Sequence, residues 1–246
     1  MHFVSETVKP VLPDDARRDR WTAHRERRRQ EFVDAALRVL EADGPGLLMD
    51  SVAAEAGVTK PVLYRYFSDK AALVRALDER GSQILLDRLL PAISADGPVL
   101  ARIRDSVGAY FAVIEEHPNL YWLVARRANV EGAGPDVIER DKEFIATALT
   151  AAIGDLLRIF GLDSGAAEPW AYGITGLVQS TGEWWLQRRS MNRAHVVEYV
   201  TRLIWAGLSG LLSEAGIALD PDRPVPAARP GLTVHRTDQA RGNAAG

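Results

Sequence analysis

Residues 50–73 read DSVAAEAGVTKPVLYRYFSDKAAL, and this stretch decides the fold of the N-terminal part of the chain. Two short apolar patterns flank Gly57, a residue that tolerates the left-handed backbone of a tight turn. We expect helices at 49–56 and 60–67. They can cross closely because Ala53, four residues before the glycine, has a small side chain. The pattern therefore predicts a helix-turn-helix.

The second of these helices has an apolar side and a polar side. The predicted apolar seam consists of Val52, Ala56, Val58 and Leu63, which leaves Lys60, Pro61, Tyr64 and Arg65 on or beside the outer face. A helix of about 8 residues is roughly 12 Å long and fits a DNA major groove of about 12 Å. A surface helical hairpin, or a module that docks a protein, is the alternative interpretation.

Basic charge lies on both sides of an acidic segment near the N-terminus. Residues 16–30 carry seven arginines and two acidic residues, residues 31–59 carry one basic and six acidic residues, and residues 60–80 carry five basic and three acidic residues. A basic arm next to a small basic helix is what phosphate binding requires. A solvated surface is the alternative reading of the same charges.

The rest of the chain predicts an all-α protein with about nine helices and no sheet. Residues 1–23 predict a disordered basic arm, and residues 24–90 a three-helix DNA-binding domain, with its motif at about 48–67 and a fourth helix that ends at Pro91. Residues 98–215 predict a helical regulatory and dimerisation domain. Its helices run from Pro98 to Pro118, over 119–129, from a turn at 131–135 to Phe160, over 169–189, and from about Arg193 to Gly216. Residues 217–246 predict a disordered tail.

Composition excludes several classes of function. The chain has no cysteine, so disulfides, zinc fingers and thiol chemistry are absent. Its five histidines have no metal-ligand spacing, and no glycine-rich phosphate loop or nucleophile elbow occurs. We therefore expect no enzyme, no cofactor and no metal. No apolar run approaches the roughly 18 residues of a membrane span, and the N-terminus is not a secretory signal, so we expect a cytoplasmic protein.

The segment GVTKPVLYRYFSDKAALVRAL resembles the DNA-binding signature of the TetR repressor family. In that family a glycine turn leads into a short helix that ends in Tyr-x-Tyr/His-Phe, and the next helix opens with a lysine. The resemblance is specific over about residues 25–85. It implies a dimeric, ligand-responsive transcriptional regulator.

The resemblance also implies which residues contact DNA. The recognition-helix contacts fall on Lys60, Pro61, Tyr64 and Tyr66, with Thr59 at the helix start, and the phosphate-binding lysine falls on Lys70. The helical wheel adds Arg65. Leu48 departs from the family pattern, which has a threonine there as a helix cap and phosphate contact, and Asp50 or Ser51 could compensate.

The predicted regulatory domain is rich in aromatic residues. Gly173 and Gly176 each cost about 1 kcal/mol in a helix interior, which indicates a close helix approach or room for a ligand. Glu183 faces either a ligand or the surface. The candidate ligand-binding residues are Phe111, Ile114, Tyr121, Trp122, Ile145, Leu149, Gly173 and Leu177; the alternative for these side chains is plain core. The candidate dimer residues are Trp184, Trp185, Leu186, Trp205, Leu208 and Leu212.

Together these features predict a homodimeric, sequence-specific regulator that binds a near-palindromic operator in double-stranded DNA. We expect a repressor that a small, largely apolar ligand releases. The alternative is a DNA-binding regulator without a small ligand, controlled by protein partners or by its own abundance.

Overall fold

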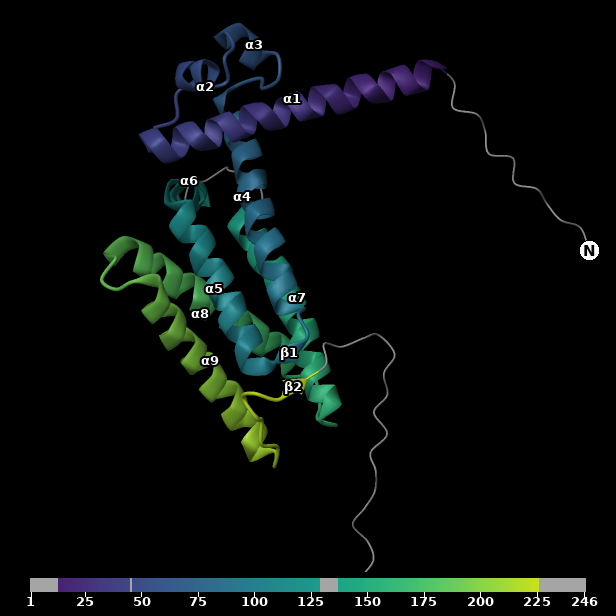
Figure 1. Ribbon diagram of the computed structural model, residues 1–246, viewed down its shortest axis with the longest axis vertical. Coiled ribbons are helices and arrows are strands. Elements are labelled where there is room, and N and C mark those ends of the chain that lie inside the picture. Colours follow the sequence, from purple (N-terminus) through teal and green to yellow (C-terminus); the bar gives the residue numbers. More distant parts are fainter. Residues whose placement is uncertain (1–12, 45, 129–136, 226–246) are drawn as a thin grey trace, which may run out of the picture. The chain divides into compact units, whose positions relative to one another are not determined.

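The computed structural model describes residues 13–44, 46–128 and 137–225, and it divides into two compact units, residues 1–80 and 81–246 (Figure 1). Over these described residues the chain forms nine helices and one pair of two-residue strands. The predicted all-α architecture is confirmed. The only extended pairing among the described residues is a short one, in which β1 (Gly97–Pro98) lies antiparallel to β2 (Pro224–Val225).

The first unit is built from α1 (Pro13–Asp43), α2 (Met49–Glu55), α3 (Lys60–Tyr64) and the beginning of α4 (Lys70–Ile93). A continuous apolar core joins them, and its fully buried members are Phe32, Val33, Ala36, Leu40, Leu47, Val52, Leu63, Leu73 and Leu77. The three- and four-residue steps along α1 place its apolar residues on one face, which packs on α2. This core stabilises the short helices α2 and α3, which would not be stable as isolated helices.

The turn between α2 and α3 has the geometry that the sequence predicts. Gly57 has φ of +64°, in the left-handed region. Its N–H donates to the carbonyl of Ala54 at 3.1 Å, and the N–H of Val58 donates to the carbonyl of Ala53 at 2.9 Å. These two hydrogen bonds close the end of α2 and turn the chain into α3. Ala53 is buried at this crossing.

Two helix boundaries in the first unit differ from the prediction. The first helix begins at Pro13 rather than near His24, because proline and the acidic residues Asp14 and Asp15 suit a first helical turn and the arginines and alanines that follow have high helix propensity. The recognition helix ends at Tyr64 and is 5 residues long, not about 8. The chain continues as a turn, in which the N–H groups of Tyr66 and Phe67 both donate to the carbonyl of Leu63.

The fourth helix ends later than the sequence predicts. Asp69 caps its start, since Asp69 Oδ1 accepts from the N–H of Ala72 at 2.7 Å. The predicted end at Pro91 was wrong, because α4 continues to Ile93 with Pro91 inside it. A proline in the last turn removes one N–H donor but blocks little of the helix that follows.

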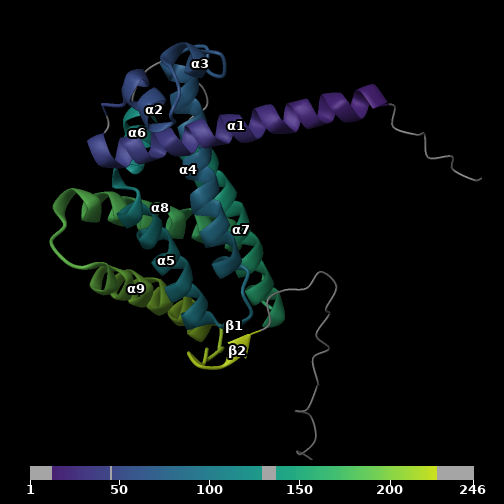
Figure 2. The same ribbon diagram turned by 45° about the horizontal axis from the view of Figure 1, so that its top comes forward.

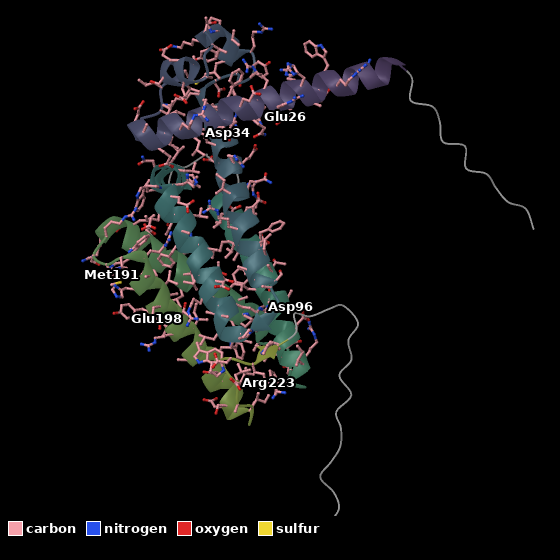
Figure 3. The ribbon with its side chains drawn as sticks, viewed as in Figure 1. Glu26, Asp34, Asp96, Met191, Glu198 and Arg223 are labelled. Atoms are coloured by element: carbon pink, nitrogen blue, oxygen red, sulfur yellow. The ribbon has the colours of Figure 1, made fainter. Side chains whose placement is uncertain are left out.

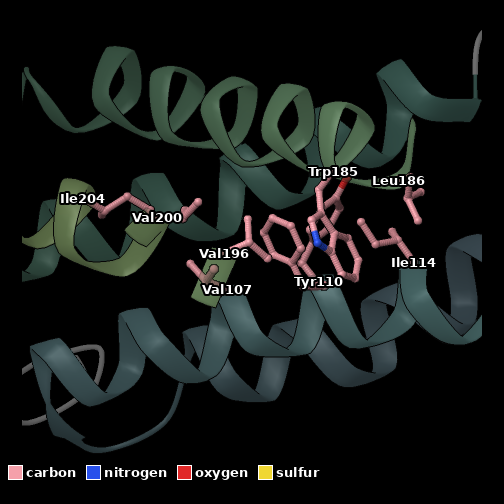
Figure 4. Packing of buried hydrophobic residues seen from close by; sticks show 9 residues of the cluster. Val107, Tyr110, Ile114, Trp185, Leu186, Val196, Val200 and Ile204 are labelled. Atoms are coloured by element: carbon pink, nitrogen blue, oxygen red, sulfur yellow. The ribbon is translucent and has the colours of Figure 1, made fainter. Parts of the chain in front are cut away.

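The second unit contains α5 (Val99–Glu116), α6 (Pro118–Ala128), α7 (Val137–Ile159), α8 (Ala167–Arg188) and α9 (Arg193–Glu214). Helix α5 packs against α8 and α9, and α7 packs against α8. Buried residues of α5, α8 and α9 form what we call the α5–α9 cluster (Figure 4). Its members are Val107, Tyr110, Phe111, Ile114, Trp185, Leu186, Val196, Val200 and Ile204.

The start of the predicted C-terminal tail belongs to this unit. Ile217, Leu219 and Val225 pack against a second buried cluster, which α5, α7, α8 and α9 share. Their large apolar side chains are sparse in the sequence, so the local composition did not indicate this packing. The remainder of the predicted tail, residues 226–246, lies outside the described residues. So do the predicted arm residues 1–12 and the predicted turn at 131–135.

Gly182 sits at the closest contact between α8 and α5. A Cβ built on Gly182 would lie 2.6 Å from Cε1 of Tyr110 and 3.0 Å from Cδ1 of Ile114. These contacts are to a packed ring and a buried methyl group, which cannot yield without moving a helix. The absent side chain at Gly182 therefore sets how closely α8 approaches α5.

We expect Gly182→Ala to lower the free energy of unfolding by about 1–3 kcal/mol, because overpacking outweighs the gain in helix propensity. The matched control is Gly108→Ala in the interior of α5, where a Cβ meets no atom within 4 Å. That change should raise the stability by up to about 1 kcal/mol. Urea unfolding of both variants checks the contrast, and equal stability of the two would contradict it.

Candidate DNA-binding surface and regulatory core

The sequence-predicted DNA contacts gather at one exposed place in the first unit. Leu63 is fully buried and fixes the inner side of α3. The outer side is exposed at Thr59, Lys60, Pro61, Tyr64 and Arg65, and Tyr64 keeps 42% of its surface accessible. Pro61 suits the first turn of a helix, where its missing N–H is not needed. The outer side chains of this five-residue helix are therefore accessible to DNA.

Lys60 carries an ion pair that the sequence did not indicate. Its Nζ donates to Oδ2 of Asp50 at 2.9 Å, across the turn of the motif. This hydrogen bond, together with the charge of Asp50, raises the pKa of Lys60 above its ordinary value. The lysine therefore stays protonated, and Asp50 fixes where its ammonium group lies.

The helix start before α2 lacks the cap that the family pattern supplies. Leu48 occupies the N-cap with extended backbone, is 62% exposed and makes no side-chain capping bond. Asp50 lies in the first turn of α2, where a carboxylate is favourable for the helix dipole. Its hydrogen bond to Lys60 gives it a further role.

Tyr66 behaves differently from the other candidate contacts. It is half-buried, and its ring packs edge-on against Phe32, with centroids 5.0 Å apart. The guanidinium of Arg25 lies over the same ring at 5.9 Å. Arg29 lies over Phe67 in the same way at 5.3 Å. Arginines of α1 therefore hold the aromatic residues that follow the recognition helix.

Lys70 opens α4 and is exposed. A cation is unfavourable at a helix N-terminus unless an anion is shared with the free N–H groups there. Lys70 and the start of α4 can bind one phosphate together. This arrangement supplies affinity without reading the base sequence.

The basic end of α1 extends beyond the part that packs on α2 and α3, as both ribbon views show (Figure 1, Figure 2). Arg18, Arg20, Arg25 and Arg27 are exposed along it, as is Trp21 with 72% of its surface accessible. In the next turn of α1, acidic residues neutralise the arginine charges. Arg28 contacts Glu31, and Arg29 contacts Glu26. Figure 3 labels Glu26 on this helix.

The eight candidate ligand-binding residues do not form one site. Five come together: Phe111 and Ile114 are buried in the α5–α9 cluster, and Tyr121, Trp122 and Leu177 pack against it half-buried. The other three lie elsewhere. Ile145 is buried with residues of α4, Leu149 packs against two further clusters, and Gly173 is exposed with no atom within 4 Å of a built Cβ.

Next to these five, the structure brings together two tyrosines and an acid. The hydroxyl of Tyr110 on α5 is buried and makes no hydrogen bond of ordinary geometry, but the hydroxyl of Tyr121 on α6 lies near enough to act on it. Burial raises the pKa of Tyr110 well above its ordinary value, with smaller contributions from Tyr121 and Glu183. Burial and then the charge of Glu183 raise the pKa of Tyr121 to about 12. The two tyrosines therefore form a buried hydroxyl pair beside Glu183.

Sequence analysis named Glu183 as a possible ligand contact but did not single out the Tyr110 hydroxyl. The signal was present in the sequence, since Gly182 and Glu183 interrupt an apolar helix side by side. The sequence alone does not show that Gly182 contacts Tyr110 of α5.

The candidate dimer residues were mostly wrong as surface positions. Trp185, Leu186, Leu208 and Leu212 are buried within the chain. Of the candidates, Trp184 is exposed, and the further exposed large apolar residues of α8 and α9 are Tyr172, Tyr199, Leu203 and Leu211. We call these five residues the α8–α9 face. The glycines of these helices at Gly173, Gly176, Gly207 and Gly210 have open space where a Cβ would lie. A step of one or two residues along a helix exchanges an inward for an outward position, so periodicity alone misassigned the buried candidates.

No helix in the described ranges combines the length and the apolar character that crossing a membrane requires.

Comparisons with known proteins agree with this architecture. Residues 32–77 match the family described as "Bacterial regulatory proteins, tetR family", and residues 88–217, more than half of the chain, match "Tetracyclin repressor-like, C-terminal domain". A solved TetR-family regulator from Streptomyces coelicolor shares the fold with a TM-score of 0.61. It is 24% identical, and the match covers 77% of this chain and 83% of that one.

Two curated relatives extend over most of the chain. The HTH-type transcriptional regulator Rv0472c of Mycobacterium tuberculosis is 35% identical over 91% of this chain and 95% of its own. The HTH-type transcriptional activator FasR of Mycolicibacterium smegmatis is 32% identical over 75% of this chain and 84% of its own. The protein therefore belongs to the TetR family of DNA-binding transcriptional regulators and is not an enzyme.

Proposed function

We propose that the protein is a homodimeric repressor that binds a near-palindromic operator and leaves it when a small, largely apolar ligand binds the second unit. The exposed outer side of α3 is the observation that carries the DNA-binding part of the proposal. Lys60, Pro61 and Tyr64 are its sequence-reading residues, with Thr59 and Arg65 beside them. Lys70 and Tyr66 fix its position on the phosphates. As a bacterial regulator that must reach chromosomal DNA, it acts in the cytoplasm.

The α8–α9 face supports the homodimer. Five large apolar side chains are exposed there, and open glycines on both helices allow the backbones of two copies to approach closely. A patch that pairs with itself gives a two-fold dimer. To match two half-sites of an operator, the two α3 helices of such a dimer must lie about 34 Å apart, one DNA turn. On this basis Gly173 and Gly176 serve the dimer contact rather than ligand room.

The ligand-responsive part of the proposal is supported by the five candidate residues that lie together at the α5–α9 cluster. A regulator without a small ligand remains the alternative, and it requires these residues to be plain core. Activation of transcription is a second candidate function. It is favoured by the similarity to FasR, which covers 75% of this chain and is named a transcriptional activator. Transcription from an operator-containing promoter with and without the protein distinguishes activation from repression.

We expect Lys60→Ala or Tyr64→Ala to weaken the free energy of operator binding by about 1–3 kcal/mol per half-site. Each change should also reduce the preference for the operator over unrelated DNA, because it removes a proposed base-edge contact. Lys70→Ala should weaken binding to all sequences alike. Fragments selected from genomic DNA give the operator, and competition against unrelated DNA measures preference. Arg104→Ala, an exposed change on α5, is the control. An unchanged preference in Lys60→Ala would remove that residue from sequence reading.

Deletion of residues 1–21 removes Arg17, Arg18 and Arg20 and should make the slope of log affinity against log salt shallower. The expected change is about 0.9 for each arginine that contacts a phosphate. Deletion of residues 1–12, which contain no arginine, is the matched control. If both deletions leave the slope as it is in the full chain, the basic end of α1 does not bind DNA.

We expect Leu203→Glu to dissociate the dimer and to weaken operator binding, because it puts a charge into the α8–α9 face. Phe144→Glu is matched to it, since both residues are 59% exposed and Phe144 lies on α7, outside this face. Sedimentation equilibrium gives the mass of each variant. A Leu203→Glu protein that stays dimeric would place the interface elsewhere.

A further inference from the structure

The two lysines that the structure describes in the first unit have different surroundings. Lys60 opens α3, and its Nζ donates a hydrogen bond to Oδ2 of Asp50, in the first turn of α2, at 2.9 Å. Lys70 is exposed at the start of α4 and makes no ion pair with any residue in the described ranges. Only the lysine on the recognition helix therefore has a carboxylate beside its ammonium group.

The ion pair is not needed to hold the motif together. Backbone hydrogen bonds at Gly57 and Val58 close the turn between α2 and α3, and Leu63 anchors α3 to the core. The side chains of Lys60 and Asp50 remain 45% and 73% exposed, and an ion pair in such a setting adds little to stability. The pair is therefore better explained by an effect on what the outer side of α3 binds.

The hydrogen bond to Asp50 restricts the position of a flexible side chain. A lysine carries its charge on a flexible four-carbon stem, and ordering that stem against a base edge costs conformational entropy. The contact with Asp50 orders part of Lys60 before DNA arrives. An ammonium group has three N–H donors, so two remain for DNA after one is given to Asp50. Lys60 is therefore held in place and can still donate.

The charge of Asp50 selects which DNA group these donors bind. Phosphate oxygens are anionic, and a carboxylate beside the ammonium group repels them and cancels part of the attraction. Guanine presents two uncharged acceptors, O6 and N7, on its major-groove edge, and a lysine can donate to both. Adenine places an N6–H donor beside its N7, which a lysine cannot use. Among the groups that face α3, guanine is therefore the best match.

We propose that Asp50 is a positioning residue that keeps Lys60 from binding phosphate and directs it to a guanine in each operator half-site. Lys70, which has no carboxylate beside it among the described residues, is the lysine that binds phosphate. The inference rests on the DNA-binding function proposed above. It names the base that Lys60 reads and the residue that makes this reading selective.

Asp50→Asn in the full-length protein tests the proposal, because it keeps the shape of the side chain and removes its charge. Competition binding is measured against a set of operators in which each base pair of the half-site is replaced in turn. The wild type should discriminate about tenfold or more in favour of guanine at one position, and Lys60→Ala should abolish this preference. Asp50→Asn should lose most of the preference at the same position and leave the other positions unchanged.

The salt dependence gives a second readout, which a purely structural role would not change. Without the carboxylate Lys60 can bind a phosphate, so Asp50→Asn should bind unrelated DNA about threefold more tightly. The slope of log affinity against log salt should steepen by up to about 0.9 for each half-site. In a Lys60→Ala background, Asp50→Asn should leave the slope and the base preference unchanged, because no ammonium group remains to be redirected.

Glu55→Gln is the matched control. It removes an acidic charge from the same helix, where Glu55 pairs with Arg38 of α1 at 2.6 Å. The change alters the net charge of the unit as Asp50→Asn does but leaves Lys60 and its partner in place. The guanine preference should therefore stay as it is in the wild type.

The outcomes separate this inference from the function on which it rests. If Lys60→Ala loses its discrimination at a base other than guanine, the proposed base is wrong. If Asp50→Asn keeps the full guanine preference, or lowers only the melting temperature, Asp50 supports the motif and does not position Lys60. In both cases the DNA-binding function stands. If the wild type selects no operator at all, that function fails and the inference fails with it.

Discussion

The first unit depends on the burial of Leu63. A five-residue helix has no stability of its own, because helix nucleation costs more than one turn of hydrogen bonds returns. Leu63 anchors α3 to the core from its inner side, and its carbonyl accepts the N–H groups of Tyr66 and Phe67 in the turn that follows. The outer side of α3 is consequently exposed, apart from the ion pair between Lys60 and Asp50. Lys60, Pro61 and Tyr64 on this side are the residues that we propose read DNA.

The aromatic residues after α3 extend this anchoring to α1. Phe67 is buried, Tyr66 packs on Phe32, and arginines of α1 lie over both aromatic rings. An arginine that packs on a ring still carries its charge, so Arg25 can hold Tyr66 and face a phosphate at once. The arginines near the N-terminus of the motif therefore combine support of the recognition helix with attraction for DNA.

The motif was predictable because its signals are local. Gly57, the small Ala53 at the helix crossing, and the apolar Val52 and Leu63 each act within a few residues, and each lies where the sequence predicted it. The regulatory unit depends on contacts between distant segments, which periodicity does not resolve. Gly173 and Gly182 look alike in the sequence of α8, yet one is exposed and the other touches Tyr110. The same limit explains why Trp185 was taken for an interface residue and why the ion pair between Asp50 and Lys60 was missed.

Helix α4 joins the two units along the chain, so the proposed ligand would act on the first unit through this helix. It begins in the first unit, where Leu73 and Leu77 are buried and Arg80 contacts Asp34 at 3.2 Å. Just beyond, a Cβ on Gly81 would lie 3.1 Å from the Leu120 side chain of α6.

Leu120 directly precedes Tyr121, one of the proposed ligand contacts, so a ligand bound there would act one residue from the contact between α6 and Gly81. Gly81 has no side chain to absorb a shift of α6, and close-packed contacts of this kind transmit displacement rather than deform. A hundredfold change in operator affinity needs about 2.7 kcal/mol of difference between the two conformations. The burial of about three methylene groups of an apolar ligand is of that size. The ligand must make these contacts better in the conformation whose recognition helices do not match the operator, because a ligand that bound both conformations equally would shift nothing.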